Sequence, residues 1–152
     1  LIEVGCGVGT LSLPLARRCR EFLGIDLCRS SIHDAEANAA HAGLSNTRFR
    51  TGRAEHTLRK LAAKQNTFDL ALVHAMRSPM GQQAMVGLDL LKPRQILYIA
   101  PKMDSMVSDI EVLKNYEIKR IGGIDQTPAT GHLLVVCLLV RRHTDDLTAP
   151  TG

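Results

Sequence analysis

Residues 1–10 of the chain read Leu1-Ile2-Glu3-Val4-Gly5-Cys6-Gly7-Val8-Gly9-Thr10. The apolar start of this segment predicts the end of a buried strand, and residues 11–19 predict a helix that leaves the glycine turn. Glycines lack a Cβ, so the turn can bend sharply and bring its backbone close to a ligand. The free N–H groups and the positive dipole end of the helix point at that ligand. The segment therefore predicts a ligand-binding turn at the end of a strand.

An acidic residue follows the next apolar segment. Residues 22–25 predict a second strand, and Asp26 comes at its end. A carboxylate in this place is suited to accept hydrogen bonds from the two hydroxyls of a ribose. The order of strand, glycine turn, helix, strand and acid therefore predicts a site for a nucleoside-bearing cofactor. A purely structural glycine turn is the alternative.

The composition is that of one globular domain. The chain has 152 residues, of which 45% are hydrophobic and only 3% are aromatic, so leucine, valine, isoleucine, alanine and methionine must form the core. The net charge of +4 makes the chain mildly basic. This charge is compatible with RNA binding but does not demonstrate it, because many basic proteins bind no nucleic acid.

The four cysteines do not form a metal-binding or disulfide pattern. Cys6 lies in the glycine turn, and the other three are predicted to be small buried side chains (Cys19, Cys28 and Cys137). We therefore expect no metal site and an intracellular, reducing compartment, with cytoplasm and mitochondrion both open. No apolar run approaches the length of a membrane span. The chain starts without Met and inside an apparent strand, so we expect further residues upstream.

Predicted strands alternate with predicted helices along the chain. Further strands are expected at residues 48–50, 67–73, 95–100, 116–121 and 133–140, and further helices at residues 31–41, 54–64, 79–91 and 104–114. This alternation predicts an α/β fold with a doubly wound, mostly parallel sheet. The last two strands have only a short connection, which favours an antiparallel pair. The expected domain covers residues 1–142, followed by a loose polar tail at 143–152.

Some residues at helix ends have two interpretations. Arg17, Arg18 and Arg20 lie near the carboxyl end of the first predicted helix, where cations suit the negative end of the helix dipole. We therefore interpret them as a helix-end feature rather than an RNA contact. Ser30 or Ser31 is the expected N-cap of the alanine-rich second helix.

The opening segment also resembles a known motif. Residues 3–16 are similar to D-x-F-C-G-x-G-T-F-x-L-P-L-A of the RNA 5-methyluridine methyltransferases, which belong to the class I S-adenosylmethionine-dependent methyltransferases. The similarity continues at residues 35–39, 91–98 and 124–132, and covers about residues 1–142. It implies a Rossmann-like sheet of seven strands with an antiparallel seventh strand, S-adenosylmethionine as cofactor, and RNA or a ribonucleoprotein as partner. The cofactor-binding residues that it implies are Glu3, Gly5, Cys6, Gly7, Gly9, Asp26 and Leu27.

The resemblance fails at the two groups that carry the family's chemistry. In that family a cysteine attacks carbon 6 of uracil, and a carboxylate later removes the proton from carbon 5. The family's S-C-N-P segment falls on residues 100–103, so Pro101 stands in place of the nucleophile. The H-V-E-T segment falls on residues 132–135, so Leu134 stands in place of the base. Neither side chain can perform its role, and we predict no catalytic residue for uracil methylation.

Other positions also depart from the family pattern. The D-P-P-R segment falls on residues 74–77, where His74 is either a cofactor contact or an ordinary histidine at a strand end. Arg53 replaces the acid after the third strand; it contacts phosphate, blocks an adenine pocket or is simply solvated. As substitutes for the lost groups, Cys137 fits a core position better, and His132 is a weak candidate for a base.

Three functional hypotheses remain. The first is an inactive domain that binds RNA or a ribonucleoprotein, for example as an assembly component. The second is an active S-adenosylmethionine-dependent methyltransferase with a nitrogen or oxygen acceptor, which needs alignment but no covalent cysteine. The third and weakest is a nicotinamide-dependent dehydrogenase, because the glycine spacing here differs from G-x-G-x-x-G. Protein partners are compatible with the first hypothesis, and no membrane association is expected.

Overall fold

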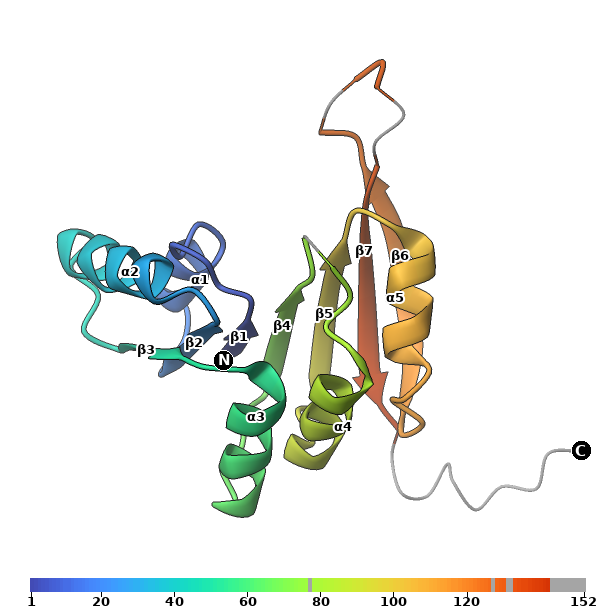
Figure 1. The fold of residues 1–152 in the computed structure, drawn as a ribbon, viewed down its shortest axis with the longest axis horizontal. Helices are drawn as coiled ribbons and strands as arrows, with labels where there is room; N and C mark the ends of the chain where they lie inside the picture. Colours follow the sequence, from blue (N-terminus) through green and yellow to red (C-terminus); the bar gives the residue numbers. More distant parts are fainter. Residues whose placement is uncertain (77, 127, 131–132, 143–152) are drawn as a thin grey trace, which may run out of the picture.

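A computed structural model describes residues 1–76, 78–126, 128–130 and 133–142 (Figure 1). The strands are β1 (Ile2–Val4), β2 (Phe22–Asp26), β3 (Thr47–Thr51), β4 (Leu70–His74), β5 (Gln95–Ala100), β6 (Tyr116–Ile124) and β7 (Leu134–Arg141). The helices are α1 (Ser12–Ala16), α2 (Arg29–His41), α3 (Ala54–Ala63), α4 (Gln82–Leu91) and α5 (Met103–Ile110). The predicted tail at 143–152 lies outside the described residues, so the boundary after residue 142 stays a prediction.

All seven strands form one sheet in the order β3-β2-β1-β4-β5-β7-β6. The pairs among β1 to β5 are parallel, whereas β7 runs antiparallel to both β5 and β6. The prediction of a doubly wound sheet with an antiparallel last strand is confirmed. β2 and β3 are added on one side of β1, whereas β4 and β5 are added on its other side, so the strand order switches between β1 and β4.

The two faces of the sheet carry different helices. Ile2, Val4 and Ile25 belong to an apolar cluster that includes buried residues of α3, α4 and α5. Glu3, which alternates with Ile2 and Val4 along β1, contacts α1 on the opposite face. Helix α2 lies on that same side, at the end of the molecule formed by β1 to β3 (Figure 1). The inner parallel strands β1, β2, β4 and β5 are therefore covered on both faces, which explains their mostly apolar sequences.

Two helix starts were predicted wrongly. α4 begins at Gln82 rather than at residue 79, because Gly81 adopts φ +86°, which an α-helix cannot contain. α2 begins directly after Cys28, an extended residue in the N-cap position, and no side chain caps it. The expected capping by Ser30 or Ser31 is therefore wrong, since both residues lie inside the helix.

Helix ends also differ from the prediction. α1 ends at Ala16, where the backbone turns toward β2 through hydrogen bonds from Arg18 N to Leu15 O and from Cys19 N to Ala16 O. No basic residue occupies the last turn of α1. Arg17 is the C-cap residue of α1, and Arg18 and Arg20 follow it, so their interpretation as a helix-end feature stays a prediction. α5 likewise ends at Ile110, four residues earlier than expected.

β6 is longer than predicted and irregular. It extends to Ile124, and its register against β7 shifts between Ile118 and Arg120, so Lys119 forms a bulge. β6 lies at one edge of the sheet, and most of its residues are exposed. Solvent exposure on both faces removes the apolar periodicity on which the sequence prediction relied.

Gly24 on β2 allows the glycine turn to pack against β3. A Cβ on Gly24 would lie 2.7 Å from Cδ1 of Phe49 and 2.9 Å from Sγ of Cys6. We predict that Gly24→Ala lowers the free energy of unfolding by about 1–3 kcal/mol, because both neighbours are held in place by packing. Gly122→Ala is the matched control, since a Cβ there meets nothing within 4 Å. Urea denaturation of the two variants measures the difference, and equal stabilities would contradict the prediction.

Candidate functional site

A cavity of about 600 Å³ opens at the carboxyl ends of β1, β2 and β4. Its volume is in the range of small-molecule sites in proteins. One wall is the glycine turn, a second is the segment after β2, and a third is the segment after β4. The lining residues are Gly5, Cys6, Gly7, Val8, Thr10, Leu11, Asp26, Leu27, Cys28, Ser31, His74, Ala75, Met76, Ser78 and Met80. Of the seven predicted cofactor residues, Gly5, Cys6, Gly7, Asp26 and Leu27 are among them.

The conformation of the turn requires glycine. Gly5, Gly7 and Gly9 all have positive φ values, of +80°, +54° and +90°. A Cβ on Gly5 would lie 2.6 Å from the carbonyl oxygen of His74, so β1 and β4 can approach each other here only if residue 5 is glycine. The amides of Gly5 and Cys6 both donate to Ile25 O, at 2.8 and 3.1 Å. The turn is therefore fixed by β2 and β4.

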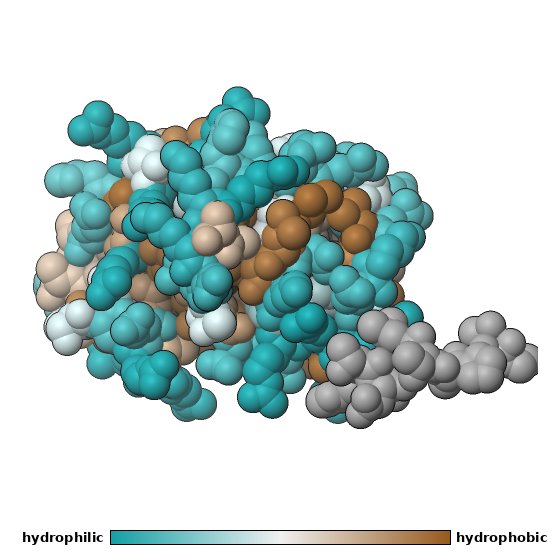
Figure 2. Space-filling model, turned by 90° about the horizontal axis from the view of Figure 1, so that it is seen from below, coloured by the Kyte–Doolittle hydropathy of each residue, from teal (hydrophilic) through white to brown (hydrophobic). Residues whose placement is uncertain are grey.

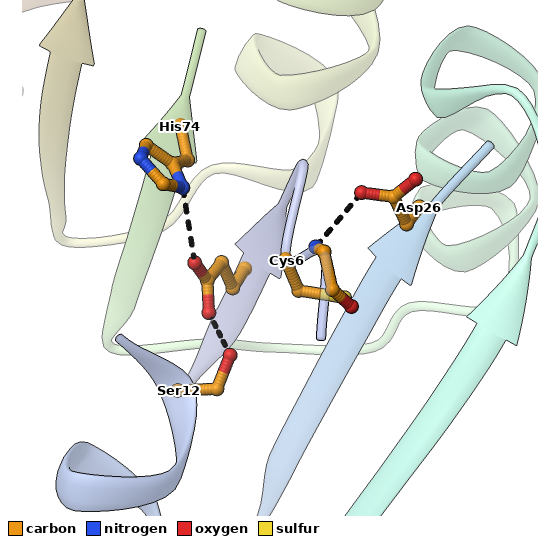
Figure 3. A network of polar contacts seen from close by, with 6 residues as sticks. Cys6, Ser12, Asp26 and His74 are labelled. Atoms are coloured by element: carbon orange, nitrogen blue, oxygen red, sulfur yellow. Dashed lines mark hydrogen bonds and ion pairs between the residues drawn. The ribbon is translucent and has the colours of Figure 1, made fainter. Parts of the chain in front are cut away.

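Asp26 connects two walls of the cavity. Its Oδ2 accepts a hydrogen bond of 2.8 Å from Gly7 N (Figure 3). Its Oδ1 accepts one of 2.8 Å from Cys28 N. The carboxylate thus lies beside the glycine turn, where the sequence placed it. Its contact with a ribose stays a prediction. The next residue, Leu27, is 69% exposed at the cavity rim.

Glu3 is buried behind the turn, with no exposed surface. Ser12 Oγ donates a hydrogen bond to its Oε2, while Oε1 has no hydrogen-bond partner and lies 3.9 Å from Nδ1 of His74 (Figure 3). Glu3 does not line the cavity itself, whereas His74 does. The sequence placed Glu3 and His74 in the same site, and the fold brings them together through neighbouring strands β1 and β4.

Burial controls the protonation of this pair. It raises the pKa of Glu3 from 4.5 to about 7, although the hydrogen bond from Ser12 opposes the shift. Burial also lowers the pKa of His74 below 6.5. Both shifts favour the neutral form of each side chain. The contact is therefore not a pair of opposite charges at neutral pH, and Glu3 is a carboxyl that changes its charge near pH 7.

The two cysteines at the cavity differ in reactivity. Cys6 is 3% exposed, and burial, aided by the charges of Glu3 and Asp26, raises the pKa of its thiol to about 12. Cys28 is exposed, so the prediction that it is buried is wrong, because it precedes α2 at the surface instead of lying in its apolar face. A 3.1 Å contact with Ser30 Oγ and further hydrogen bonding with Ser31 lower the pKa of Cys28 to about 7. Nothing in the spacing of the cysteines indicates this difference.

The positions of the missing catalytic groups both lie at one end of the ladder between β5 and β7. Its last pair is Ala100 with Val135, and Pro101 follows Ala100 while Leu134 precedes Val135. The two lie where the family's nucleophile and base are expected to meet, yet neither offers a thiol or a carboxylate. Cys137 is fully buried within β7, as predicted. His132 lies outside the described residues.

A buried aspartate that the sequence analysis missed holds the segment after β4. Asp109 of α5 is 1% exposed and accepts hydrogen bonds from Met80 N at 2.6 Å and Gly81 N at 3.0 Å. The hydroxyl of Tyr98 also donates to it. Asp109 therefore fixes a cavity wall from outside the cavity. Its place on α5 gave no signal, since two of its partners are backbone amides 28 and 29 residues away in the sequence.

Arg53 does not enter the cavity. It precedes α3, does not line the cavity, and its Nε contacts Oε1 of Glu55 at 2.6 Å. Of its three interpretations, the solvated arginine agrees with this geometry. Within the described ranges no group of three metal-ligating side chains occurs. No helix in the same part of the chain is long and apolar enough to cross a membrane.

Comparison with known families decides how the cavity is to be interpreted. Residues 1–128 match the model of the methyltransferase domain. The chain belongs to the methyltransferase domain family. The glycine turn, Asp26 and strands β1 to β6 all lie within the matched residues.

Curated relatives of this methyltransferase domain are named RNA methyltransferases. An uncharacterized RNA methyltransferase of Bacillus cereus is 32% identical over 143 residues, which are 93% of this chain but 31% of the relative. A second, from Nostoc, is also 32% identical and is matched over 30% of its length. The chain thus spans about a third of the length of these relatives.

Solved structures share the fold. The tRNA (uracil-54, C5)-methyltransferase of Pyrococcus abyssi, in complex with S-adenosyl-L-homocysteine, superimposes with a TM-score of 0.79 at 24% identity, over 91% of this chain and 33% of that one. Magnesium protoporphyrin IX methyltransferase of Synechocystis, with bound S-adenosylmethionine, gives 0.67 at 17% identity, over 93% of this chain and 69% of that one. The methyltransferase domain therefore has the class I methyltransferase fold.

The raised pKa of Glu3 gives the domain a specific pH dependence. The folded state holds the Glu3 proton more tightly than the unfolded state, so stability falls as pH rises from about 4.5 to about 7. We predict that Glu3→Gln removes this slope and gains up to roughly 3 kcal/mol of relative stability across that window. Urea denaturation at several pH values measures the effect. Parallel pH profiles for the two proteins would contradict it.

Proposed function

We propose that this methyltransferase domain binds S-adenosylmethionine at the glycine turn and serves as an RNA- or ribonucleoprotein-binding component that does not methylate uracil. RNA as partner is supported by the names of the curated relatives and by the net charge of +4. An intracellular location, in cytoplasm or mitochondrion, is part of this proposal, and so are protein partners.

The residues present fit the cofactor. The cavity lies on the open side of a turn held by β2 and β4, and it has the right size for a small molecule. Behind the turn, the unpartnered Oε1 of Glu3 can accept a hydrogen bond from a donor that enters beside His74. Gly5, Gly7 and Asp26 would hold the cofactor from the turn, and Leu27 and Met80 would supply apolar contacts. When bound, S-adenosylmethionine supplies an electrophilic methyl group.

The loss of uracil methylation is supported by the residues Pro101 and Leu134, which stand where the family has its nucleophile and its base. Covalent activation of uracil needs an ionisable thiol, and proton removal needs a positioned base. Both residues border the last pair of the β5–β7 ladder, Ala100 with Val135, and neither carries a thiol or a carboxylate. No described neighbour substitutes for them: Cys137 is buried, and burial raises the pKa of its thiol.

An active enzyme with another acceptor is the second candidate. The observation in its favour is that the cavity extends past the turn to His74 and Met76, where an acceptor could lie. Transfer to a nitrogen or oxygen atom needs alignment with the methyl group rather than a covalent cysteine. Arg77, which completes this segment, lies outside the described residues.

Cofactor binding is the first property to measure. We predict that S-adenosylmethionine binds with micromolar affinity in calorimetry, and that Asp26→Ala weakens binding at least about tenfold, because the variant loses the carboxylate and the anchor of Gly7. Asp34→Ala is the matched control, since Asp34 is exposed on α2 outside the cavity. Absence of binding to the folded wild-type protein would remove the cofactor from the proposal.

The second prediction concerns covalent chemistry. RNA that contains 5-fluorouridine traps a uracil methyltransferase, because carbon 5 then carries no proton for the base to remove and the bond to the cysteine persists. We expect no covalent adduct on a denaturing gel with this chain and S-adenosylmethionine. A family member that carries the S-C-N-P cysteine is the positive control. An adduct with this chain would contradict the loss of uracil chemistry.

A further inference from the structure

A second cavity, of about 670 Å³, lies at the amino ends of the parallel strands, whereas the cofactor cavity lies at their carboxyl ends. It is lined by the amino ends of β2 and β4, by residues 18–21 before β2, by β3 and by the last turns of α3. The amino ends of parallel strands lie on one side of a sheet and their carboxyl ends on the other, so the two cavities open at opposite ends of the strands. Figure 2 views the molecule from below, toward the amino ends of β4 and β5, and shows mostly hydrophilic side chains with apolar ones between them.

Basic side chains dominate the lining of this second cavity, which we call the amino-edge groove. Its six cationic residues are Arg18, Arg20, Arg48, Arg50, Lys60 and Lys64. Only two carboxylates, Glu21 and Asp69, line it as well. Six of the 19 lysines and arginines of the chain thus gather in one groove. None of the six takes part in the ion pairs found among the described residues.

The backbone arranges these cations in rows. Arg48 and Arg50 alternate along β3 with Phe49, which packs on Phe22 at 5.8 Å between ring centroids. The two arginines therefore project together from the opposite face, about 7 Å apart along the strand. Lys60 and Lys64 are four residues apart at the end of α3 and share one side of that helix.

The third row is held by a side-chain anchor. Asn46 Nδ2 donates to Ala16 O at 2.8 Å and to Cys19 O at 2.7 Å. These two bonds fix the turn that carries Arg18 and Arg20 against the start of β3. Three elements of the fold therefore hold the cations of the groove in place: β3, α3 and the turn before β2 each present two of them.

Like charges held this close repel one another unless an anionic partner neutralises them. A partner with negative charges spaced along a chain can neutralise all three rows of cations at once. The phosphate backbone of RNA has this property. The half-buried Phe68, which lines the groove together with the buried Leu61, adds an apolar surface on which an unpaired base can rest.

We propose that the amino-edge groove binds the phosphate backbone of single-stranded RNA, at a site separate from the cofactor cavity. The choice of RNA among polyanions rests on the proposed function, whereas the groove itself rests on its cations. The two ends of the parallel strands then bind different ligands. The carboxyl ends bind the cofactor, and the amino ends bind the RNA backbone without base-specific contacts.

The test is RNA binding as a function of salt. A labelled oligouridylate of about 15 nucleotides is titrated with the 152-residue chain, and the affinity is followed between about 50 and about 200 mM salt. We expect Arg48→Ala/Arg50→Ala to weaken binding at least about tenfold and to reduce the salt slope by about 1.4, the value for two phosphate contacts on a single strand. Lys114→Ala/Arg120→Ala is the matched control, because it removes the same charge from exposed positions outside the groove.

Each outcome has one meaning. An equal loss in both double variants, or no salt-dependent RNA binding by the folded wild-type chain, overturns the groove. Binding of polyglutamate as tight as that of RNA overturns the assignment to RNA. Calorimetry with S-adenosylmethionine on folded Arg48→Ala/Arg50→Ala keeps the two proposals distinct. We expect unchanged cofactor affinity, and a parallel loss of both ligands by the folded variant would mean that the sites are not separate.

Discussion

The carboxylate of Asp26 is the contact on which the site depends. One oxygen holds the amide of Gly7 in the turn after β1, and the other holds the amide of Cys28 before α2. Two segments far apart in the sequence are thereby fixed to the end of one strand. A carboxylate suits this task because it accepts several hydrogen bonds, and bonds to a charged acceptor are the stronger ones. The walls of the cavity are thus set before any ligand enters.

The fold was predictable because its signals are local and mutually consistent. Alternating apolar and helical segments indicated the sheet, and the short link before β7 indicated the antiparallel pair. Helix limits were harder to predict, because they depend on backbone geometry such as the positive φ of Gly81 and the turn after Ala16. β6 was predicted too short, since an exposed edge strand carries no apolar alternation.

The site was predictable only where a motif names its residues. Asp26 and the glycines of the turn follow from their order along the chain, and their neighbourhood follows from the fold. Asp109 was missed because it acts on backbone amides from a distant helix. Cys28 was misjudged because exposure depends on how α2 is oriented, which its sequence does not reveal. The burial of Glu3, and hence its raised pKa, needs the packing of α1.

The bulge at Lys119 has a consequence for solubility. An edge strand such as β6 offers unpaired backbone groups to a second chain, and Ile118, Ile121 and Ile124 add about half-exposed apolar side chains. The irregular register twists the strand, and the charges of Lys119 and Arg120 stand in the middle of it. A flat, uncharged strand of this length would invite intermolecular β-pairing. The bulge and the two charges thus oppose self-association at this edge strand, where the exposed isoleucines would favour it.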